Sequence, residues 1–367
     1  MNQVADTCRQ KGNRGIMAVK ATRSDVARLA GVSPTTVSDV LNGNEKARVN
    51  EETRGRVVAA ANELGYRANA MARGLVMQRS FNLGVVICHS RENSPMSRQS
   101  FMFDIMLGIQ DAISEHRQNM VIVLADAITE VDYLGMLHER RVDGIIFCQM
   151  KMYDMSVLES VSGIENYPVI TVSSRSEMPR YPYVCVDNRG GIFQAVAHLV
   201  QLGHKRIGYV NAAADSSDFF ERIRAYEEAL IHYGLEFDPG IVLSQRPYSH
   251  NEMGNALIYR DDRPTAIIAA QDGLAVWLCH AIRRCGLSVP DDIAVIGFDD
   301  AAEAGHCDPP LTTIRQPTYR MGIAAANKLL GLVMDEGGGG TAAEVMPTEL
   351  IIRESCGAAR SVQRWLD

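Results

Sequence analysis

The stretch that most constrains this chain is residues 22–42, TRSDVARLAGVSPTTVSDVLN, where two short helix patterns meet at one glycine and a turn. The first pattern opens with Thr22 as N-cap and Asp25 three residues later, which together form a capping box. Gly31 is expected to end this helix, and Ser33, directly before a proline, is a preferred N-cap for the next. Two helices joined this tightly are typical of a helix–turn–helix, which presents one helix to DNA.

Apolar residues predict which faces of these helices are buried. Val26, Leu29 and Ala30 fall on one face of the first helix, and the inward residues expected in the second are Val37, Val40 and Leu41. The residues of the second helix on or near its outer face are small or polar: Pro34, Thr35, Ser38, Asp39 and Asn42. A third helix is expected from Asn50 to Gly65. An ordinary three-helix bundle without a DNA role is the alternative that periodicity alone leaves open.

Charge is distributed unevenly along the chain. Residues 1–79 hold 13 Lys or Arg against 7 Asp or Glu, a net charge of +6. The rest holds 24 Lys or Arg against 37 Asp or Glu, a net charge of −13, and the two parts together give the −7 of the whole chain. A basic N-terminal part suits contact with phosphates and the acidic remainder is repelled by them, which favours a DNA-binding role for the N-terminal helices.

Three motifs, DVARLAGVSPTTVSDVLNG, VNEETRGRVVAAANELGY and NAMARGL, resemble the N-terminal domain of the lactose-repressor and galactose-repressor (LacI/GalR) family of bacterial transcription factors. The resemblance implies that residues 34–42 form the recognition helix in the major groove, with Pro34 and Thr35 reading base edges. Asp39 stands where members of the family often carry a basic or larger polar residue. Arg23 stands at a position that is usually apolar in the family. The implied DNA-binding residues are Thr22, Ser33, Pro34, Thr35, Ser38, Asp39, Asn42, Asn69, Arg73 and Leu75.

Residues 68–80 are expected to contain a hinge helix and linker, because NAMARGL matches the hinge helix of that family. In the family this segment becomes ordered on DNA and inserts a leucine between central base pairs of the minor groove, and Leu75 is the matching residue. Gly74 weakens so short a helix, which fits folding coupled to binding. Ala68 replaces the usual proline. A flexible linker with a chance apolar residue is the alternative.

From Leu83 onward, short apolar runs alternate with helical patterns, which predicts a β–α–β series with parallel strands and right-handed crossovers. The strands, all expected to be buried, are LGVVI from residue 83, MVIVL from 120, GIIF from 144, PVITV from 168, RIGYV from 206, TAIIAA from 265 and IAVIGF from 293. The expected helices are FDIMLGIQDAISEH, GIFQAVAHLVQLG, FERIRAYEEALIHYG and LAVWLCHAIRRCG.

Further motifs of the same family, VDGIIF, DNRGG, HLVQLGHKRIGYV, GLSVPDDIAVIGFDD and PPLTTIRQP, extend the resemblance to about residues 22–356. It implies a small all-α helix–turn–helix head and an α/β core like a periplasmic binding protein, with two doubly wound parallel-sheet lobes and three chain crossings. The expected limits are a disordered tail at 1–21, the head at 22–67, an N-lobe at 81–185 and 315–333, and a C-lobe at 186–314 and 345–358. Translation from Met17 instead of Met1 stays an alternative.

Ligands of open α/β sheets bind beyond the carboxyl ends of the strands, so the loops that follow strands are the expected place for a ligand site. By resemblance, Arg222 matches the effector-contacting arginine of the family and Asp299 matches the acid that accepts from sugar hydroxyls. The full implied set is Phe101, Ser173, Arg222, Tyr248, Gln271, Asp299 and Gln316. Gln271 and Ser173 stand where many members have asparagine and aspartate. In the alternative, Asp299 simply caps the turn after its strand, and Arg222 is a surface helix residue without a ligand role.

Catalytic and cofactor motifs are missing from the sequence, which has no G-x-G-x-x-G after a strand, G-x-x-x-x-G-K-[ST], G-x-S-x-G or H-E-x-x-H. The eight cysteines lack C-x-x-C spacing and the nine histidines do not cluster with them, so neither a cofactor nor a metal is expected. Scattered cysteines suit a reducing cytoplasm. No apolar run approaches the length of a membrane span.

The sequence therefore predicts a cytoplasmic, homodimeric transcription factor, most simply a repressor, rather than an enzyme. It is expected to bind a pseudo-palindromic double-stranded DNA operator and a small effector, a sugar or sugar derivative, between its lobes. Two other classes stay open: a solute-binding protein of a transport system, and an α/β sugar-modifying enzyme.

Overall fold

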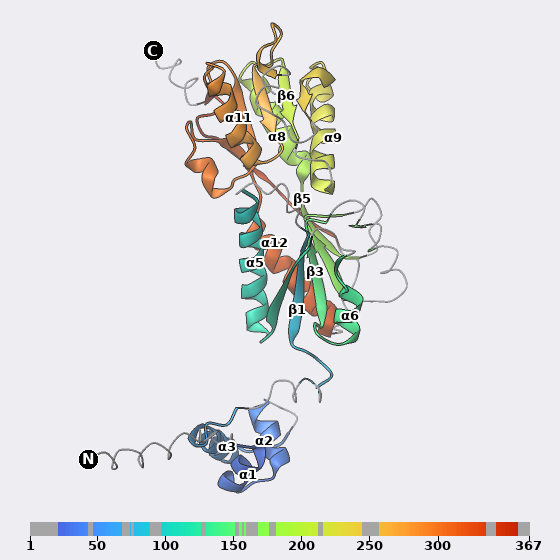
Figure 1. The fold of residues 1–367 in the computed structure, drawn as a ribbon, viewed down its shortest axis with the longest axis vertical. Helices are drawn as coiled ribbons and strands as arrows, with labels where there is room; N and C mark the ends of the chain where they lie inside the picture. The colour runs from blue at the N-terminus through green and yellow to red at the C-terminus, as the bar shows by residue number, and fades with distance from the viewer. Residues whose placement is uncertain are drawn as a thin grey trace, which may run out of the picture. The chain divides into compact units, whose positions relative to one another are not determined.

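The computed structural model describes residues 21–42, 47–67, 74, 77–88, 97–125, 130–150, 154–155, 158, 168–175, 181–211, 216–243, 257–334 and 343–358. The chain divides into two compact units, one up to Ser80 and the other from Phe81 (Figure 1). No helix in these described segments is both long and apolar enough to cross a membrane.

Within the described residues, the folded core of the first unit is formed by three helices, and each begins directly after a residue that caps it. They are α1 (Arg23–Ala30), α2 (Pro34–Leu41) and α3 (Glu51–Glu63). The predicted capping box of Thr22 and Asp25 is present, and the side chain of Asn50 caps α3. Gly31 adopts a left-handed conformation with φ 65°, which ends α1 and allows the tight turn into α2.

The core of this unit is formed by small apolar side chains from all three helices: Val26, Ala27, Ala30, Val37, Val40, Val57, Ala60 and Ala61. The prediction for Leu29 is wrong, because its side chain is 48% exposed and Ala27 is buried instead. The buried stripe of α1 is centred on Ala30, and at 100° per residue Leu29 lies outside it. Leu41 is half-buried against the cluster, as expected.

The second unit contains two sheets, and the first has the strand order β11–β5–β4–β3–β1–β2 with every described pairing parallel. Its strands are β1 (Asn82–Cys88), β2 (Asn119–Ala125), β3 (Gly144–Cys148), β4 (Val169–Val172), β5 (Tyr183–Val186) and β11 (Glu344–Met346). The expectation of a buried strand at MVIVL is wrong, because Ile122 and Leu124 are exposed. β2 lies at the edge of the sheet, where a strand is covered less completely.

The second sheet has the order β12–β10–β9–β8–β6–β7. Its strands are β6 (Ile207–Val210), β7 (Val242–Leu243), β8 (Ala266–Ala269), β9 (Ala294–Asp299), β10 (Thr312–Arg315) and β12 (Glu349–Ile351). Its described pairings are parallel except that β12 runs antiparallel to β10. The prediction of parallel strands is thus confirmed for all seven strands that the sequence predicted, and the antiparallel β12 was not among them.

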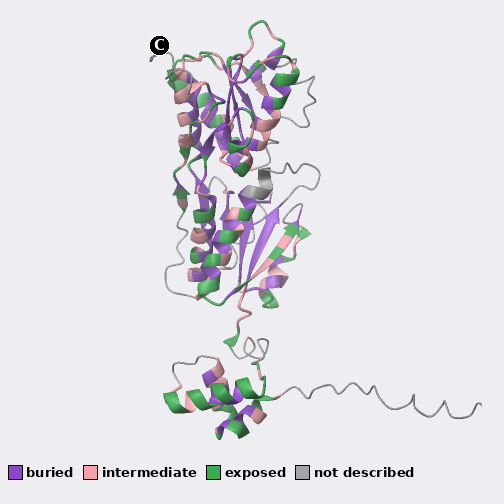
Figure 2. Cartoon of the chain, turned by 90° about the vertical axis from the view of Figure 1, so that its left-hand side faces the viewer, coloured by how far each residue is buried: buried purple, intermediate pink, exposed green. Residues whose placement is uncertain are grey.

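Helices cover both faces of each sheet, as a doubly wound fold requires (Figure 2). The first sheet packs α5 (Ser97–Glu115) and α12 (Thr318–Met334) on one face and α6 (Tyr133–His138) on the other. The second packs α8 (Asn188–Gln201) and α9 (Ser217–His232) on one face and α11 (Asp272–Arg284) on the other. We call the first sheet with its helices the first lobe and the second the second lobe.

Among the described elements the chain passes between the lobes at three places: between β5 and α8, between β10 and α12, and between β11 and β12. Arg315 ends β10 in the second sheet and Val345 lies in β11 of the first, so the crossings fall a few residues after the limits expected at 315 and 345. Strands of three or four residues carry too little periodicity to fix such limits. The other domain limits stay predictions.

Two glycines bring the backbones of α5 and α12 into direct contact. A Cβ atom built on Gly108 would lie 2.1 Å from the carbonyl oxygen of Tyr319, and one built on Gly322 would lie 2.2 Å from the carbonyl oxygen of Ile105. Both clashes are with backbone, which cannot move aside as a flexible side chain would. The close approach of α5 and α12 therefore requires glycine, which has no Cβ atom, at both positions.

We expect Gly322→Ala to lower the free energy of unfolding by about 3 kcal/mol, at the upper end of the cost of overpacking, because the helices must separate. Gly331→Ala in the same helix is the matched control, since nothing lies within 4 Å of its Cβ position. There alanine should stabilise by up to about 1 kcal/mol through helix propensity. Denaturant unfolding of both variants measures the difference, and equal effects would contradict the proposed role of the contact.

Candidate functional site

The N-terminal end of α2 presents an exposed surface formed by short side chains. Pro34 and Thr35 are exposed, and Pro34 occupies the first helical position, where its missing N–H removes no hydrogen bond. The hydroxyl of Ser33 accepts from the backbone N–H of Thr36 at 3.0 Å and so fixes the start of the helix. Because the first N–H groups of a helix carry partial positive charge, this end of α2 suits a negatively charged partner.

The other residues predicted to contact DNA differ in their surroundings. Ser38, Asp39 and Asn42 are half-buried, and the Asn42 amide donates to the Ser38 hydroxyl at 3.1 Å. Thr22 is engaged in its capping box with Asp25. The predicted hinge residues Asn69, Arg73 and Leu75 lie outside the described residues.

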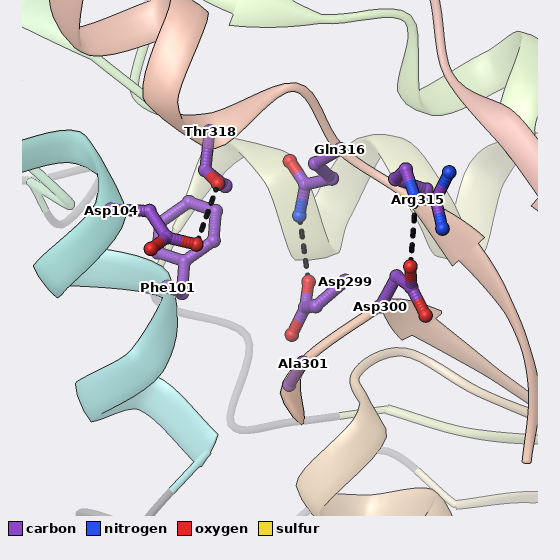
Figure 3. A pocket seen from close by; sticks show the side chains of 8 residues that line it. All are labelled: Phe101, Asp104, Asp299, Asp300, Ala301, Arg315, Gln316 and Thr318. Carbon is purple, nitrogen blue, oxygen red and sulfur yellow. Dashed lines mark hydrogen bonds and ion pairs between the residues drawn. The ribbon is translucent and has the colours of Figure 1, made fainter. Parts of the chain in front are cut away.

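A cavity of about 190 Å³ lies where α5, the end of β9 and the β10–α12 crossing meet (Figure 3). It is lined by Phe101, Asp104, Asp299, Asp300, Ala301, Arg315, Gln316 and Thr318. Phe101 and Asp104 come from the first lobe, and Asp299 and Asp300 come from the second. The cavity is therefore bounded by both lobes, at the carboxyl end of the strands of the second sheet.

The backbone turns sharply at the end of β9, so that the neighbouring carboxylates of Asp299 and Asp300 bind different partners. Asp299 has φ 126° and Asp300 has φ 55°, conformations that non-glycine residues rarely adopt. The amide of Gln316 donates to Asp299 at 2.6 Å (Figure 3). Asp300 instead accepts from Arg315 at 2.7 Å and from Arg353 at 2.6 Å. Such strain is stored most often at functional sites.

Arg222 is a buried cation, with a side chain only 3% exposed, beside this turn. Its Nε donates to the side-chain oxygen of Asn188 at 2.7 Å, and its Nη1 donates to the carbonyl of Ala270 at 2.6 Å. The same Nη1 lies 3.8 Å from a carboxylate oxygen of Asp299. The guanidinium also stands 3.6 Å from the centre of the Phe298 ring, where a cation–π interaction adds to its stabilisation.

Asp272, at the start of α11, is fully buried behind Asp299. Burial, and then the neighbouring Asp299 charge, raises the pKa of Asp272 to about 8. Its carboxyl group lies 2.6 Å from the Thr313 hydroxyl and accepts from the backbone N–H of Ala301 at 2.8 Å. These bonds connect α11 to β10 and to the turn that follows β9.

Several buried polar atoms near the ends of strands have no hydrogen-bond partner within the described structure. They are Ser173 Oγ, both polar atoms of the Asn211 side chain, Gln271 Nε2 and Gln316 Oε1. The inner strands β4, β6 and β8 are followed within two residues by Ser173, Asn211 and Gln271, respectively. Gln316 directly follows β10. Among these residues Gln316 lines the cavity, where its unmet acceptor suits a ligand with hydroxyl donors. In the described segments no three His, Cys, Asp or Glu side chains are grouped so as to hold a metal ion.

The structure brings together Phe101, Arg222, Asp299 and Gln316 of the predicted effector set, and Gln271 follows the Ala270 carbonyl that Arg222 contacts. Ser173 is buried in the loop after β4, without a described contact to these residues. Tyr248 lies outside the described residues. The polar lining residues that were not predicted from the sequence are Asp104, Asp300, Arg315 and Thr318. Asn188 and Asp272, which lie beside Arg222 and Asp299, were not predicted either. Asp272 and Asp300 follow strands closely, so the rule that ligands bind beyond strand ends pointed to them.

Comparison with known proteins agrees with this architecture. Residues 22–69 match the family model described as bacterial regulatory proteins, lacI family, and residues 196–356 match that of a periplasmic binding protein-like domain. The HTH-type transcriptional repressor PurR of Photobacterium profundum is 31% identical over 340 residues, which cover 91% of this chain and 98% of that protein.

Two solved structures are similar over nearly the whole chain. A complex of the transcriptional regulator CelR with cellobiose has 30% identity and a TM-score of 0.67, covering 91% of this chain and 99% of that one. The Lac repressor dimer bound to operator and the anti-inducer ONPF has 25% identity and a TM-score of 0.76, covering 92% and 99%. The helix–turn–helix unit, the two-lobe core and these relatives together show that the chain belongs to the LacI family of DNA-binding transcriptional regulators.

Proposed function

We propose that this regulator is a cytoplasmic repressor that binds a pseudo-palindromic operator as a homodimer and responds to a carbohydrate held between its lobes. The observation that carries the proposal is the cavity bounded by both lobes, with Arg222, Asp299 and Gln316 beside it. A ligand in such a cavity interacts differently with each relative arrangement of the lobes, which is what control of operator affinity requires.

Recognition of DNA is assigned to the exposed end of α2. Pro34 and Thr35 are short, so the helix backbone can approach base edges closely, and Thr35 offers a methyl group to thymine and a hydroxyl to other bases. The formal charge of +6 over residues 1–79 supplies attraction to phosphates. The repressor role is supported by the relative PurR, which is named a repressor.

Dimerisation is assigned to an apolar surface on the first lobe, formed by α5 and β2. Phe103 and Leu107 of α5 are 56% and 41% exposed, and Ile122 and Leu124 of β2 are 48% and 66% exposed. Ile122 and Leu124 pair in register with Val85 and Ile87 of β1, which belong to the core beneath α5.

The two exposed pairs therefore lie on the same face of the sheet, at its edge. Exposed apolar groups collected on one surface are typical of a protein interface. A second copy of this chain is the proposed occupant, because the similar Lac repressor is a dimer on its operator and a palindromic site requires twofold symmetry.

The effector is assigned to the carbohydrates because Asp299, Arg315 and Gln316 line the cavity, Arg222 lies beside Asp299, and Gln316 Oε1 has no partner within the described structure. Sugar hydroxyls both donate and accept, so they can donate to Gln316 Oε1 and to the Asp299 carboxylate. The similar regulator CelR has been solved with cellobiose. We propose that the protein acts on its ligand by binding alone, without catalysis, because the relatives that it matches, such as PurR and CelR, are transcriptional regulators.

The DNA-binding proposal is tested on the DNA upstream of the gene that encodes the chain. Parent protein should shift this DNA, with an affinity that falls steeply as salt rises. Thr35→Ala should weaken binding by about 1 to 3 kcal/mol, the usual cost of losing a contact to a base, since the Thr35 side chain is exposed at the start of α2. As a control, circular dichroism of Thr35→Ala must show that the helical N-terminal unit is still folded. Unchanged affinity would exclude Thr35 from recognition, and the absence of any shift would refute the operator proposal.

The dimer proposal is tested by Leu124→Arg. A charge at the centre of the apolar surface should convert the dimer to a monomer of 40.3 kDa in analytical ultracentrifugation. Ile231→Arg is the matched control, because Ile231 on α9 is also 66% exposed but lies on the second lobe. If Leu124→Arg stays dimeric, or if both variants dissociate equally, the interface lies elsewhere.

The effector proposal is tested by a thermal-shift screen of monosaccharides and disaccharides on the full-length protein. Asp299→Asn keeps an acceptor for Gln316 but removes the charge, and it should weaken the stabilising sugar at least about tenfold, as expected for a hydrogen bond to a charged group. Asp308→Asn, whose side chain is 84% exposed, is the surface control. A sugar that binds Asp299→Asn as tightly as the parent would place the site elsewhere, and a screen without any stabilising sugar would refute the carbohydrate assignment.

A further inference from the structure

Arg175 connects the first lobe to the second by two interactions with α9. It follows β4 of the first sheet, and its Nε donates to Glu221 Oε1 at 2.6 Å. Its backbone N–H donates to the Ser217 hydroxyl at 3.1 Å. The guanidinium also stands 5.8 Å from the centre of the Tyr183 ring in the first lobe. The Arg175 side chain thus contacts Tyr183 in the first lobe and Glu221 in the second lobe at the same time.

Asn188 joins this contact to the buried arginine of the ligand site. Its Nδ2 donates to Glu221 Oε2 at 3.1 Å, and its Oδ1 accepts from Arg222 Nε at 2.7 Å. Asn188 is only 1% exposed, and a second bond from Nδ2 reaches Asp218 at 2.9 Å. Because both ends of its amide are engaged, the amide has one favourable orientation. A shift of the Arg222 guanidinium therefore reorients the Asn188 amide and disturbs the hydrogen bond that this amide donates to Glu221.

An ion pair extends this connection from Arg222 to the cavity. Arg222 lies 3.8 Å from Asp299, which accepts from Gln316 at 2.6 Å, and Asp299 and Gln316 both line the cavity. A ligand that engages Asp299 or Gln316 competes with the hydrogen bond between these two residues, and through Asp299 with the ion pair to Arg222. The polar chain thus runs from the cavity through the second lobe to a loop of the first.

We propose that Arg175 and Glu221 form a latch between the lobes, and that Asn188 transmits occupancy of the Arg222 site to this latch. Arg175, Glu221 and Asn188 are positioning residues that act through Arg222. The latch sets the relative arrangement of the lobes, and the ligand changes that arrangement by redistributing the bonds of one buried amide. This inference rests on the proposed function only where operator affinity is the readout.

A matched control exists within the second lobe. Arg189 of α8 forms an ion pair with Glu228 of α9 at 2.8 Å, and its guanidinium also lies over an aromatic ring, that of Phe193. This pair has the same chemistry as Arg175 and Glu221 but does not join the two lobes. Removing it should leave the lobe arrangement unchanged.

Hydrogen–deuterium exchange of the full-length protein without DNA tests the latch directly. Glu221→Ala should speed exchange of the Arg175 amide, because its bond to Ser217 depends on contact between the lobes. Arg189→Ala should leave this exchange at the parent rate. Exchange at the parent rate in Glu221→Ala, or an equal increase in both variants, would overturn the latch whatever the protein does on DNA.

Operator affinity tests whether the latch is coupled to function. Arg175→Ala and Glu221→Ala should change the operator affinity in the same direction by about fivefold or more, the usual range of such coupling, and the double variant should change it no further. Additive effects of the two substitutions, or parent affinity in both, would refute the coupling. If the parent protein itself binds no operator, the proposed function fails while the exchange experiment still decides the latch.

Discussion

The buried guanidinium of Arg222 is the constraint around which the junction of the two lobes is organised. A cation removed from water must be matched by acceptors, because an unpaired buried charge costs several kcal/mol. Asn188, Ala270 and Asp299 supply these acceptors from the start of α8, the end of β8 and the end of β9. Three segments that are distant in sequence are therefore fixed around one side chain.

The cavity and the connection between the lobes are built from the same pieces of chain. Gln316 lies in the β10–α12 crossing, and Thr318 begins α12, so residues that line the cavity also link the lobes. The glycine contact at Gly108 and Gly322 then holds α12 against α5, which carries Phe101 and Asp104 into the same cavity. A rotation of one lobe against the other must reshape the cavity, and a ligand that fills the cavity favours one rotation.

The sequence predicted the elements with strong local patterns, and it failed where a long-range contact decides the outcome. The capping residues Thr22 and Ser33, the end of α1 at Gly31 and the long apolar strands β1, β3 and β9 were all predicted, because each is determined by neighbours in the sequence. The exposure of Leu124 was not predicted, because it follows from the edge position of β2 in the sheet. Asn188 was missed for a similar reason: its importance depends on Glu221 and Arg222, which only the fold brings near.

The buried carboxyl of Asp272 has a consequence for the energetics of folding. Its pKa rises from the ordinary 3.8 to about 8 in the folded chain. Between these two values the native protein keeps a proton that the denatured chain has released. Since the state that binds more protons is favoured by acidity, the contribution of this group to stability is greatest at low pH and declines as the pH rises toward 8. Folding in neutral solution is thus accompanied by proton uptake at the centre of the second lobe.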